Sequence, residues 1–137
     1  MIITATINNS HQQNNITVQT NGNGKTISIP SKPNGQGSSV NGGELLRLAL
    51  ATCYCNDIYR EAPSRNITIH SVQVTATSKF GKEGEPGSDI RYEAMVEADC
   101  SEKELQKLLT GVDAIAEVHN TLRRGANVTL LLKKALH

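Results

Sequence analysis

Residues 42–62 read GGELLRLALATCYCNDIYREA and carry the pattern of a helix that is enclosed by protein. Asn41 can cap its start because Glu44 follows three residues later, and Pro63 sets its end. The first half of this stretch is apolar on nearly every side, which is typical of a buried helix. The apolar side chains are Leu45, Leu46, Leu48, Ala49, Leu50, Ala51, Cys53, Cys55 and Ile58. We therefore predict that this helix is the core of the fold.

Three short β-rich pieces, separated by polar turns, precede this helix. They are residues 2–7, 16–18 and 26–29, and the turns between them are rich in Asn and Gly. This pattern predicts a meander of three strands. Residues 31–43 read SKPNGQGSSVNGG and predict a loop. A loop of this length in a small domain is often functional.

Two longer β-patterns follow the helix, at residues 67–77 and 89–98, with a turn at 81–87 between them. The second alternates strictly between apolar and other residues, so one face of this sheet is expected to be buried. Ser101 and Glu104 then form a capping box for a second helix, which Gly125 is placed to end. Residues 128–132 predict a last strand. The order βββ, α, ββ, α, β indicates an α+β fold, and we expect residues 1–137 to form a single domain.

Charge and hydropathy exclude several classes of protein. Lys and Arg number 14 against 13 for Asp and Glu, so no long-range field would attract nucleic acid or an anionic membrane. No apolar run reaches the roughly 18 residues that span a bilayer, and a cytoplasmic location is the default expectation. The partner is expected to be a small molecule or a second copy of the chain.

The three cysteines, Cys53, Cys55 and Cys100, are too few for the disulfide framework of a secreted domain and are expected to be reduced thiols. Cys53 lies within the helix predicted to be most enclosed, and buried cysteines are commonly small hydrophobic residues. Cys55 points roughly 200° away from Cys53 on a helix, so these two cannot form a disulfide and Cys55 is interpreted as core. Cys100 falls at an exposed junction. No metal-ligand spacing is present, and neither a metal nor another cofactor is expected.

His119 is the one ionisable residue on the apolar stripe of the second predicted helix. Two interpretations stay open. It is either a hydrogen-bonded histidine of the core or of an interface, or a residue that faces a pocket and contacts Cys53 or a ligand.

Several motifs occur in an order that matches a known family. The Gly/Ser/Asn loop leads to Glu-Leu-Leu at 44–46, then to Cys53 in a long helix, and then to Asn-Ile at 66–67 before a Val-x-Val strand. Val118 and the Asn-Thr-Leu at 120–122 follow. Over roughly residues 24–132, the chain resembles the OsmC/Ohr family of osmotically inducible and organic hydroperoxide resistance proteins. The resemblance implies an OsmC-like fold whose central helices pack between two sheets in an intertwined homodimer, with the cysteine sites at the subunit interface.

The resemblance also implies a peroxidase role in which Cys53 attacks a peroxide and becomes a sulfenic acid. Here Ala116 stands where the family has the second, resolving cysteine, and Glu117 stands where a proline follows it. The arginine of the N-terminal strands is missing. Glu44 is one residue off the expected spacing of the orienting carboxylate. Asp57, four residues after Cys53, would oppose formation of the thiolate.

Two classes of function therefore remain. The first is a slow thiol-dependent hydroperoxide reductase with Cys53 as the nucleophile, Glu44 as a possible orienting carboxylate, and an external thiol, or Cys100, in place of the missing cysteine. The second is a non-catalytic dimeric module with an apolar pocket at its interface, lined by Cys53 and by residues such as Cys55, Ala116 and His119. The expected ligand is a small apolar molecule or a hydroperoxide.

Overall fold

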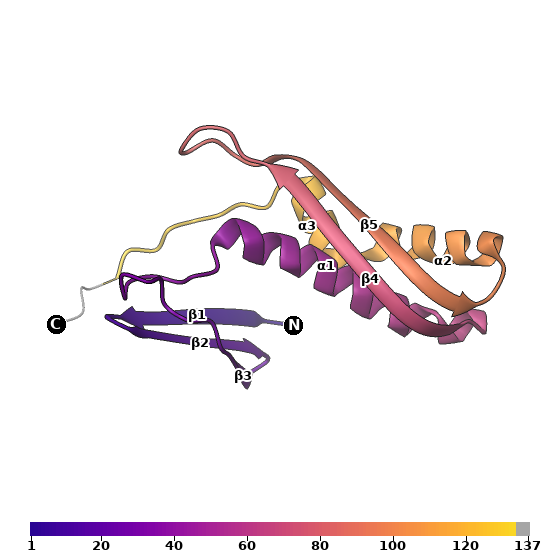
Figure 1. Cartoon of the computed structure of the whole chain (residues 1–137), viewed down its shortest axis with the longest axis horizontal. Helices are drawn as coiled ribbons and strands as arrows, with labels where there is room; N and C mark the ends of the chain where they lie inside the picture. The colour runs from indigo at the N-terminus through magenta and orange to yellow at the C-terminus, as the bar shows by residue number, and fades with distance from the viewer. Residues whose placement is uncertain (134–137) are drawn as a thin grey trace. The chain divides into compact units, whose positions relative to one another are not determined.

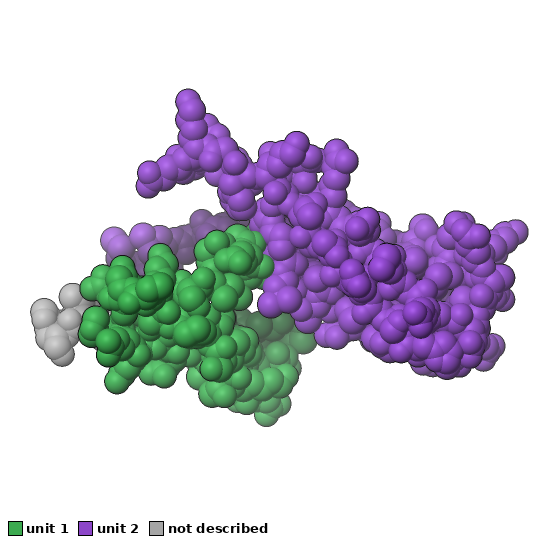
Figure 2. All heavy atoms as spheres, in the orientation of Figure 1, with its two compact units in different colours: residues 1–46 green, residues 47–137 purple. Residues whose placement is uncertain are grey.

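The computed structural model describes residues 1–133. Figure 1 shows three strands, a long helix, a two-stranded hairpin and two shorter helices, in this order along the chain. The chain separates into two compact units, residues 1–46 and the part that begins at residue 47 (Figure 2). No helix in the described part is long and apolar enough to cross a membrane. The α+β class is confirmed, and the single domain stays a prediction.

The first unit contains an antiparallel sheet in the order β1-β2-β3, which confirms the predicted meander. Its strands are β1 (Ile3–Ser10), β2 (Gln13–Thr20) and β3 (Asn23–Ile27). Asn21 and Gly22 join β2 to β3 with φ angles of 49° and 83°. Two successive residues with positive φ are what a two-residue hairpin turn requires, and Asn-Gly is its preferred sequence. The turn residues of the sequence thus determine this connection.

One face of this sheet carries a row of isoleucines, one from each strand. Ile7 is paired with Ile16, and Ile16 is paired with Ile27. Residues directly opposite each other in an antiparallel sheet share a face, so the three side chains form one apolar row. Ile7 and Ile27 nevertheless remain 56% and 43% exposed.

Helix α1 (Gly42–Glu61) starts where the capping box predicts. The Asn41 side chain accepts a hydrogen bond from the Glu44 amide at 2.8 Å, and the Glu44 carboxylate accepts one from the Asn41 amide at 3.1 Å. Two amides that the first helical turn leaves unpaired are thereby satisfied. A short 3₁₀ helix, η1 (Pro63–Arg65), follows the end of α1.

The first half of α1 is not enclosed within the single chain, so its predicted enclosure stays a prediction that depends on the expected homodimer. Leu45, Leu46 and Leu48 are 38%, 37% and 59% exposed, whereas the buried residues of α1 are Leu50, Tyr54, Asp57 and Ile58. These four follow the i, i+4, i+7, i+8 spacing of a single helix face. Leu45 and Leu48 point away from this face, and the described chain leaves both exposed.

The second unit is built on the hairpin of β4 (Thr68–Lys79) and β5 (Ser88–Asp99). Its pairing passes from Ile69–Ala98 to Ser71–Glu97, so His70 is an extra residue that forms a β-bulge. The alternating side chains of one face pack on a core that is supplied by α1, by α2 and by the segment between α1 and β4. This core consists of Tyr54, Ile58, Ala62, Ile67, Leu108 and Val112. The buried face predicted from the alternation of β5 is therefore confirmed.

The uninterrupted second helix predicted for residues 101–125 is wrong. Two helices are present instead, α2 (Glu102–Ile115) and α3 (Glu117–Arg124), and Ala116 between them is extended with φ −64° and ψ 106°. The capping box at Ser101 and the end at Gly125 agree with the prediction. The break is stabilised from α3, because the Asn120 side-chain amide donates to the carbonyl of Ala114 at 3.0 Å. A carbonyl at the end of α2 thus finds a partner without a continuous helix.

The last strand predicted at residues 128–132 is also wrong for this chain. Residues 125–133 form neither helix nor strand, and Val128, Leu130 and Leu132 are 97%, 81% and 88% exposed. A strand requires a neighbour that accepts and donates its backbone hydrogen bonds, and this segment has none among the described residues.

Candidate functional site

Cys53 lies near the middle of α1 with its side chain half-buried. Its thiol donates a hydrogen bond to Oδ2 of Asp57, and the two atoms are 3.8 Å apart. The spacing of four residues explains this contact, because side chains at i and i+4 are neighbours on a helix surface. The carboxylate that the sequence places near Cys53 is therefore in contact with it.

Asp57 in turn pairs with Arg60. The carboxylate is buried, and its Oδ1 lies 3.2 Å from Nη1 of Arg60. Arg60 also bonds Glu61 through Nε at 3.1 Å, and this bond, followed by the charge of Asp57, raises the pKa of Arg60. The guanidinium offsets part of the negative charge that Asp57 presents to the thiol. A salt-bridging role is one that the sequence allows for Arg60, and the structure identifies Asp57 as a partner.

The other two cysteines are free thiols of intermediate exposure. Cys100 packs against the core cluster of the second unit, so the expectation that its position is exposed is wrong. Leu105, in the first turn of α2, packs on the same cluster. A resolving role for Cys100 stays a prediction.

Glu44 and Ala116 were both expected close to Cys53. The Glu44 carboxylate is bound to the backbone as part of the α1 cap. On an ideal helix, nine residues correspond to about 180° around the axis, so Glu44 and Cys53 would point in opposite directions. Ala116 is fully buried at the junction of α2 and α3. Glu117 is the first residue of α3, a position that suits proline, which agrees with the alignment to a Cys-Pro pair.

His119 is the centre of a second cluster, which brings α1, β5, α2 and α3 together. It is 3% exposed, and neither ring nitrogen has a hydrogen-bond partner among the described residues. The Tyr92 ring packs edge-on at 4.5 Å between centroids, and the Tyr54 ring lies 5.9 Å away. Burial, followed by the charge of Arg123, lowers the pKa of His119, so the imidazole is neutral at pH 7.

A carboxylate ties this cluster together. The Tyr92 hydroxyl donates to Oδ1 of Asp113, and Nη2 of Arg123 lies 2.6 Å from the same oxygen. These two hydrogen bonds lower the pKa of Asp113, whereas burial and the bond to Asp113 raise that of Tyr92. Tyr54 donates to the carbonyl of Leu109 at 2.7 Å, and burial raises its pKa to about 12. Sequence reasoning missed this network. Its one signal is a tyrosine on a core-facing position, which needs a partner for its hydroxyl.

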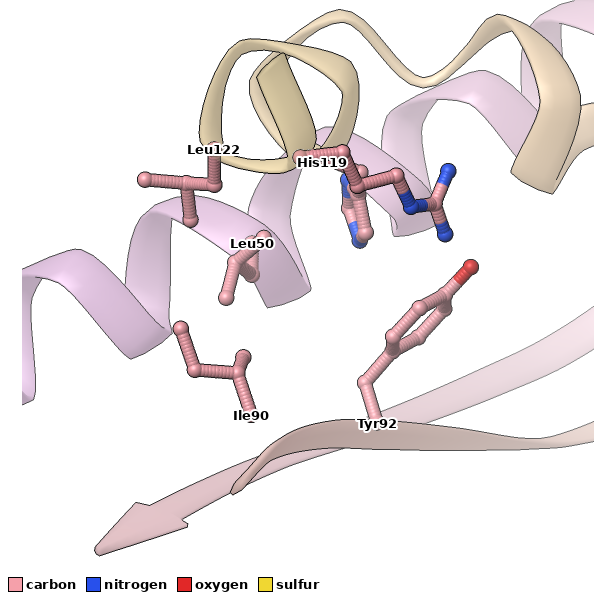
Figure 3. A pocket seen from close by; sticks show the side chains of 6 residues that line it. Leu50, Ile90, Tyr92, His119 and Leu122 are labelled. Atoms are coloured by element: carbon pink, nitrogen blue, oxygen red, sulfur yellow. The ribbon is translucent and has the colours of Figure 1, made fainter. Parts of the chain in front are cut away.

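A pocket of about 180 Å³ opens beside this cluster. Figure 3 shows Leu50 on α1, His119 and Leu122 on α3, and Ile90 and Tyr92 on β5 around it. Arg123 completes the lining. Cys53, Cys55 and Ala116 are not among the lining residues. In the part of the chain that the structure describes, no three His, Cys, Asp or Glu side chains are grouped as metal ligands.

Comparisons with known proteins agree with this architecture. A family model described as OsmC-like protein matches residues 35–131. An OsmC-like protein from Mycoplasma pneumoniae is similar in structure with a TM-score of 0.63 at 21% identity, over 89% of this chain and 86% of that one. An organic hydroperoxide resistance protein from Elizabethkingia anophelis has a TM-score of 0.62 at 18% identity, over 91% and 90%. OhrB, an organic hydroperoxide resistance protein of Bacillus subtilis, has 0.55 at 20%, over 97% and 98%. No curated protein matches the sequence.

Proposed function

Because the chain belongs to the OsmC-like protein family, we propose that it is a slow, thiol-dependent reductase of organic hydroperoxides that uses Cys53 as its nucleophile. The observation that carries this proposal is the contact of the Cys53 thiol with the Asp57–Arg60 pair. The Cys53 thiol donates a hydrogen bond to one oxygen of the Asp57 carboxylate, and the Arg60 guanidinium lies on the other oxygen. Two of the similar structures are hydroperoxide resistance proteins.

The proposed reaction has two steps. The Cys53 thiolate attacks the terminal oxygen of R–OOH, the O–O bond breaks, and the leaving alkoxide takes up a proton to become the alcohol. Cys53 is oxidised to a sulfenic acid. An external thiol then condenses with the sulfenic acid and releases water, and a second thiol reduces the mixed disulfide and regenerates Cys53. A dithiol reductant supplies both of these thiols.

Asp57 explains why the first step is expected to be slow. Its carboxylate holds the proton of the Cys53 thiol in a hydrogen bond, and a negative charge at this distance disfavours a second one on sulfur. Arg60 offsets this repulsion in part, because its guanidinium lies on the other carboxylate oxygen. Asp57 thus keeps the thiol oriented, and Arg60 limits the electrostatic cost.

The proposal requires an external reductant because position 116 holds alanine. Without a thiol at that position, the sulfenic acid is expected to persist until a small thiol or a redox protein reaches it. A reducing cytoplasm, where thiols are abundant, suits this chemistry, and we propose a cytoplasmic location for the same reason.

We further propose that the protein is an intertwined homodimer. Its support is the amount of apolar surface that the single chain leaves uncovered on three separate elements. Ile7 of β1, Leu48 of α1 and Leu130 near the C-terminus are 56%, 59% and 81% exposed. Large apolar surfaces of this kind are typical of protein interfaces. A second copy would also give residues 128–132 the strand neighbour that they lack.

The alternative function, a non-catalytic dimeric module that binds an apolar ligand, is favoured by the same alanine at position 116. A peroxidase assay distinguishes the two. The wild type, supplied with cumene hydroperoxide and a dithiol, is expected to consume the peroxide slowly and to gain one oxygen atom on Cys53 when the dithiol is withheld.

Three single variants provide the comparison. Cys53→Ser is expected to abolish consumption, whereas Cys55→Ser and Cys100→Ser, which remove equally half-buried thiols, are expected to keep it. Consumption by the wild type no faster than by Cys53→Ser would leave the binding module as the better account.

A further inference from the structure

The pocket beside His119 has the features of a built binding site, although Cys53 does not line it. We propose that it binds a small uncharged molecule that has an apolar body and one hydroxyl group. The inference does not rest on the proposed peroxidase function, because every residue that carries it lies outside the Cys53–Asp57–Arg60 contact.

The size of the pocket limits the ligand. Its volume is about 180 Å³, somewhat larger than the engineered cavity of about 150 Å³ that is known to bind benzene. One six-membered ring with a single substituent, or a short aliphatic chain, therefore matches the size of the pocket. Leu50, Ile90 and Leu122 supply apolar walls from three different elements, as Figure 3 shows.

The unpartnered imidazole of His119 indicates what else the ligand must carry. A buried polar group without a hydrogen bond costs about 1–3 kcal/mol, so native proteins rarely leave one unpaired. Both nitrogens of this 97% buried ring lack a partner among the described residues, as the 3% exposure and the hydrogen-bond geometry together show. A neutral imidazole has one donor and one acceptor. A hydroxyl group matches either nitrogen, since it both donates and accepts.

The charges around the pocket favour a neutral ligand over an anion. Arg123 is the one cation in the lining, and both of its terminal nitrogens are already bound to Asp113 or Asn120. The Arg123–Asp113 pair carries no net charge. An anion in the pocket would find no free positive charge, because the imidazole is neutral and Arg123 already neutralises the Asp113 carboxylate. Burial of an uncompensated charge is costly. Tyr92 adds a hydroxyl oxygen that can accept one more hydrogen bond.

Phenol, toluene and benzoate together test each part of the proposal. Titration of the wild type is followed by calorimetry and by the ¹⁵N resonances of the His119 ring. Phenol is expected to saturate the protein, to shift the His119 nitrogens, and to bind roughly fivefold to tenfold more tightly than toluene, as one hydrogen bond requires. Benzoate is expected to bind more weakly than phenol.

Two variants locate the site. His119→Phe keeps a ring of similar shape and is expected to reduce the affinity for phenol to that for toluene. His70→Phe, which changes an exposed histidine of β4, is the matched control and is expected to leave both affinities unchanged. Cys53→Ser is likewise expected to bind phenol as the wild type does, which separates this proposal from the peroxidase function.

Three results would overturn the proposal, and two of them need no variant. They are the absence of saturable phenol binding by the wild type, equal affinities for phenol and toluene, and phenol affinity that His119→Phe leaves intact. The wild-type comparison of phenol with toluene decides the matter even if His119→Phe does not fold.

Discussion

Arg123 binds Asp113 twice, through Nη2 to the carboxylate at 2.6 Å and through Nη1 to the main-chain carbonyl at 3.2 Å. The Arg123 side chain on α3 thus binds both the carboxylate and the backbone carbonyl of a residue near the end of α2. The helix break at Ala116 depends on such contacts, because no backbone hydrogen bonds connect the two helices across an extended residue.

Arg123→Ala is therefore expected to lower the free energy of unfolding by about 1–2 kcal/mol, since it leaves the Asp113 carboxylate without its cation. Arg124→Ala removes the neighbouring arginine, which has no hydrogen bond or ion pair in the described structure, and is expected to change stability by less than about 0.5 kcal/mol. Urea unfolding of both variants measures the difference. Equal losses would mean that the double contact contributes nothing specific.

Ala116→Cys is expected to restore a second thiol opposite Cys53 and to allow a disulfide between them, provided that the two Cα atoms lie within about 7 Å. Mild oxidation followed by mass spectrometry of the linked peptides detects the bond. Ile115→Cys, one residue earlier and 43% exposed, serves as the control and should form no such link. Failure of Ala116→Cys to cross-link with Cys53 would reject the alignment with the family's second cysteine.

Acidification is expected to destabilise the protein through His119, whose pKa is lowered in the fold. The unfolded chain binds a proton as the pH falls through about 6.5, while the folded chain resists protonation. The contribution of His119 to the free energy of unfolding is thus complete above about pH 6.5. At lower pH it decreases, by at most about 1.4 kcal/mol per pH unit. The charged groups around the ring are Arg123, Asp113 and Asp57.

The measurement is unfolding free energy at pH 7 and pH 5.5 for the wild type and for His119→Phe. The wild type should lose more stability than the variant over this interval, because all other titrating groups are common to both. An identical loss in the two proteins would show that His119 is protonated as easily in the fold as in the unfolded chain.

The homodimer is expected to depend on the apolar side chains near the C-terminus. Leu130→Asp together with Leu132→Asp should shift the sedimenting species from dimer toward monomer at micromolar concentration. Thr129→Asp adds a charge at the position before Leu130, on the other side of an extended segment, and is the matched control. A wild type that sediments as a monomer would refute the dimer itself.

Local signals in the sequence predicted the elements whose boundaries depend on neighbouring residues. The capping boxes at Asn41 and Ser101 fix the starts of α1 and α2, and the apolar alternation of β5 gives its buried face. The Asn21-Gly22 turn is predicted for the same reason. In the capping boxes and the turn, the stabilising contact joins residues within a few positions of one another, and the alternation of β5 is a period-two repeat that the sequence shows directly.

The elements that were missed depend on contacts that no local signal in the sequence marks. The break at Ala116 is stabilised by side chains four and seven residues further on, in what the apolar stripe predicts as one helix. Tyr92 and Asp113, 21 positions apart, meet only in the folded chain. The strand predicted near the C-terminus has the correct alternation but no neighbour in the described residues, and alternation alone cannot supply one.

The bulge at His70 has a consequence for changes of chain length. Ile69 and Val72 both face the core although they are three positions apart, because β4 holds one extra residue between them while their partners on β5, Ala98 and Val96, are two positions apart. Deletion of His70 would leave Ile69, Ser71 and Val72 in regular alternation, with every flanking side chain on its present face. Deletion of a residue in the regular part of β4 would move the side chains of one half of the strand to the opposite face of the sheet. Loss of a single residue is therefore expected to be tolerated better at position 70 than in the regularly paired part of β4.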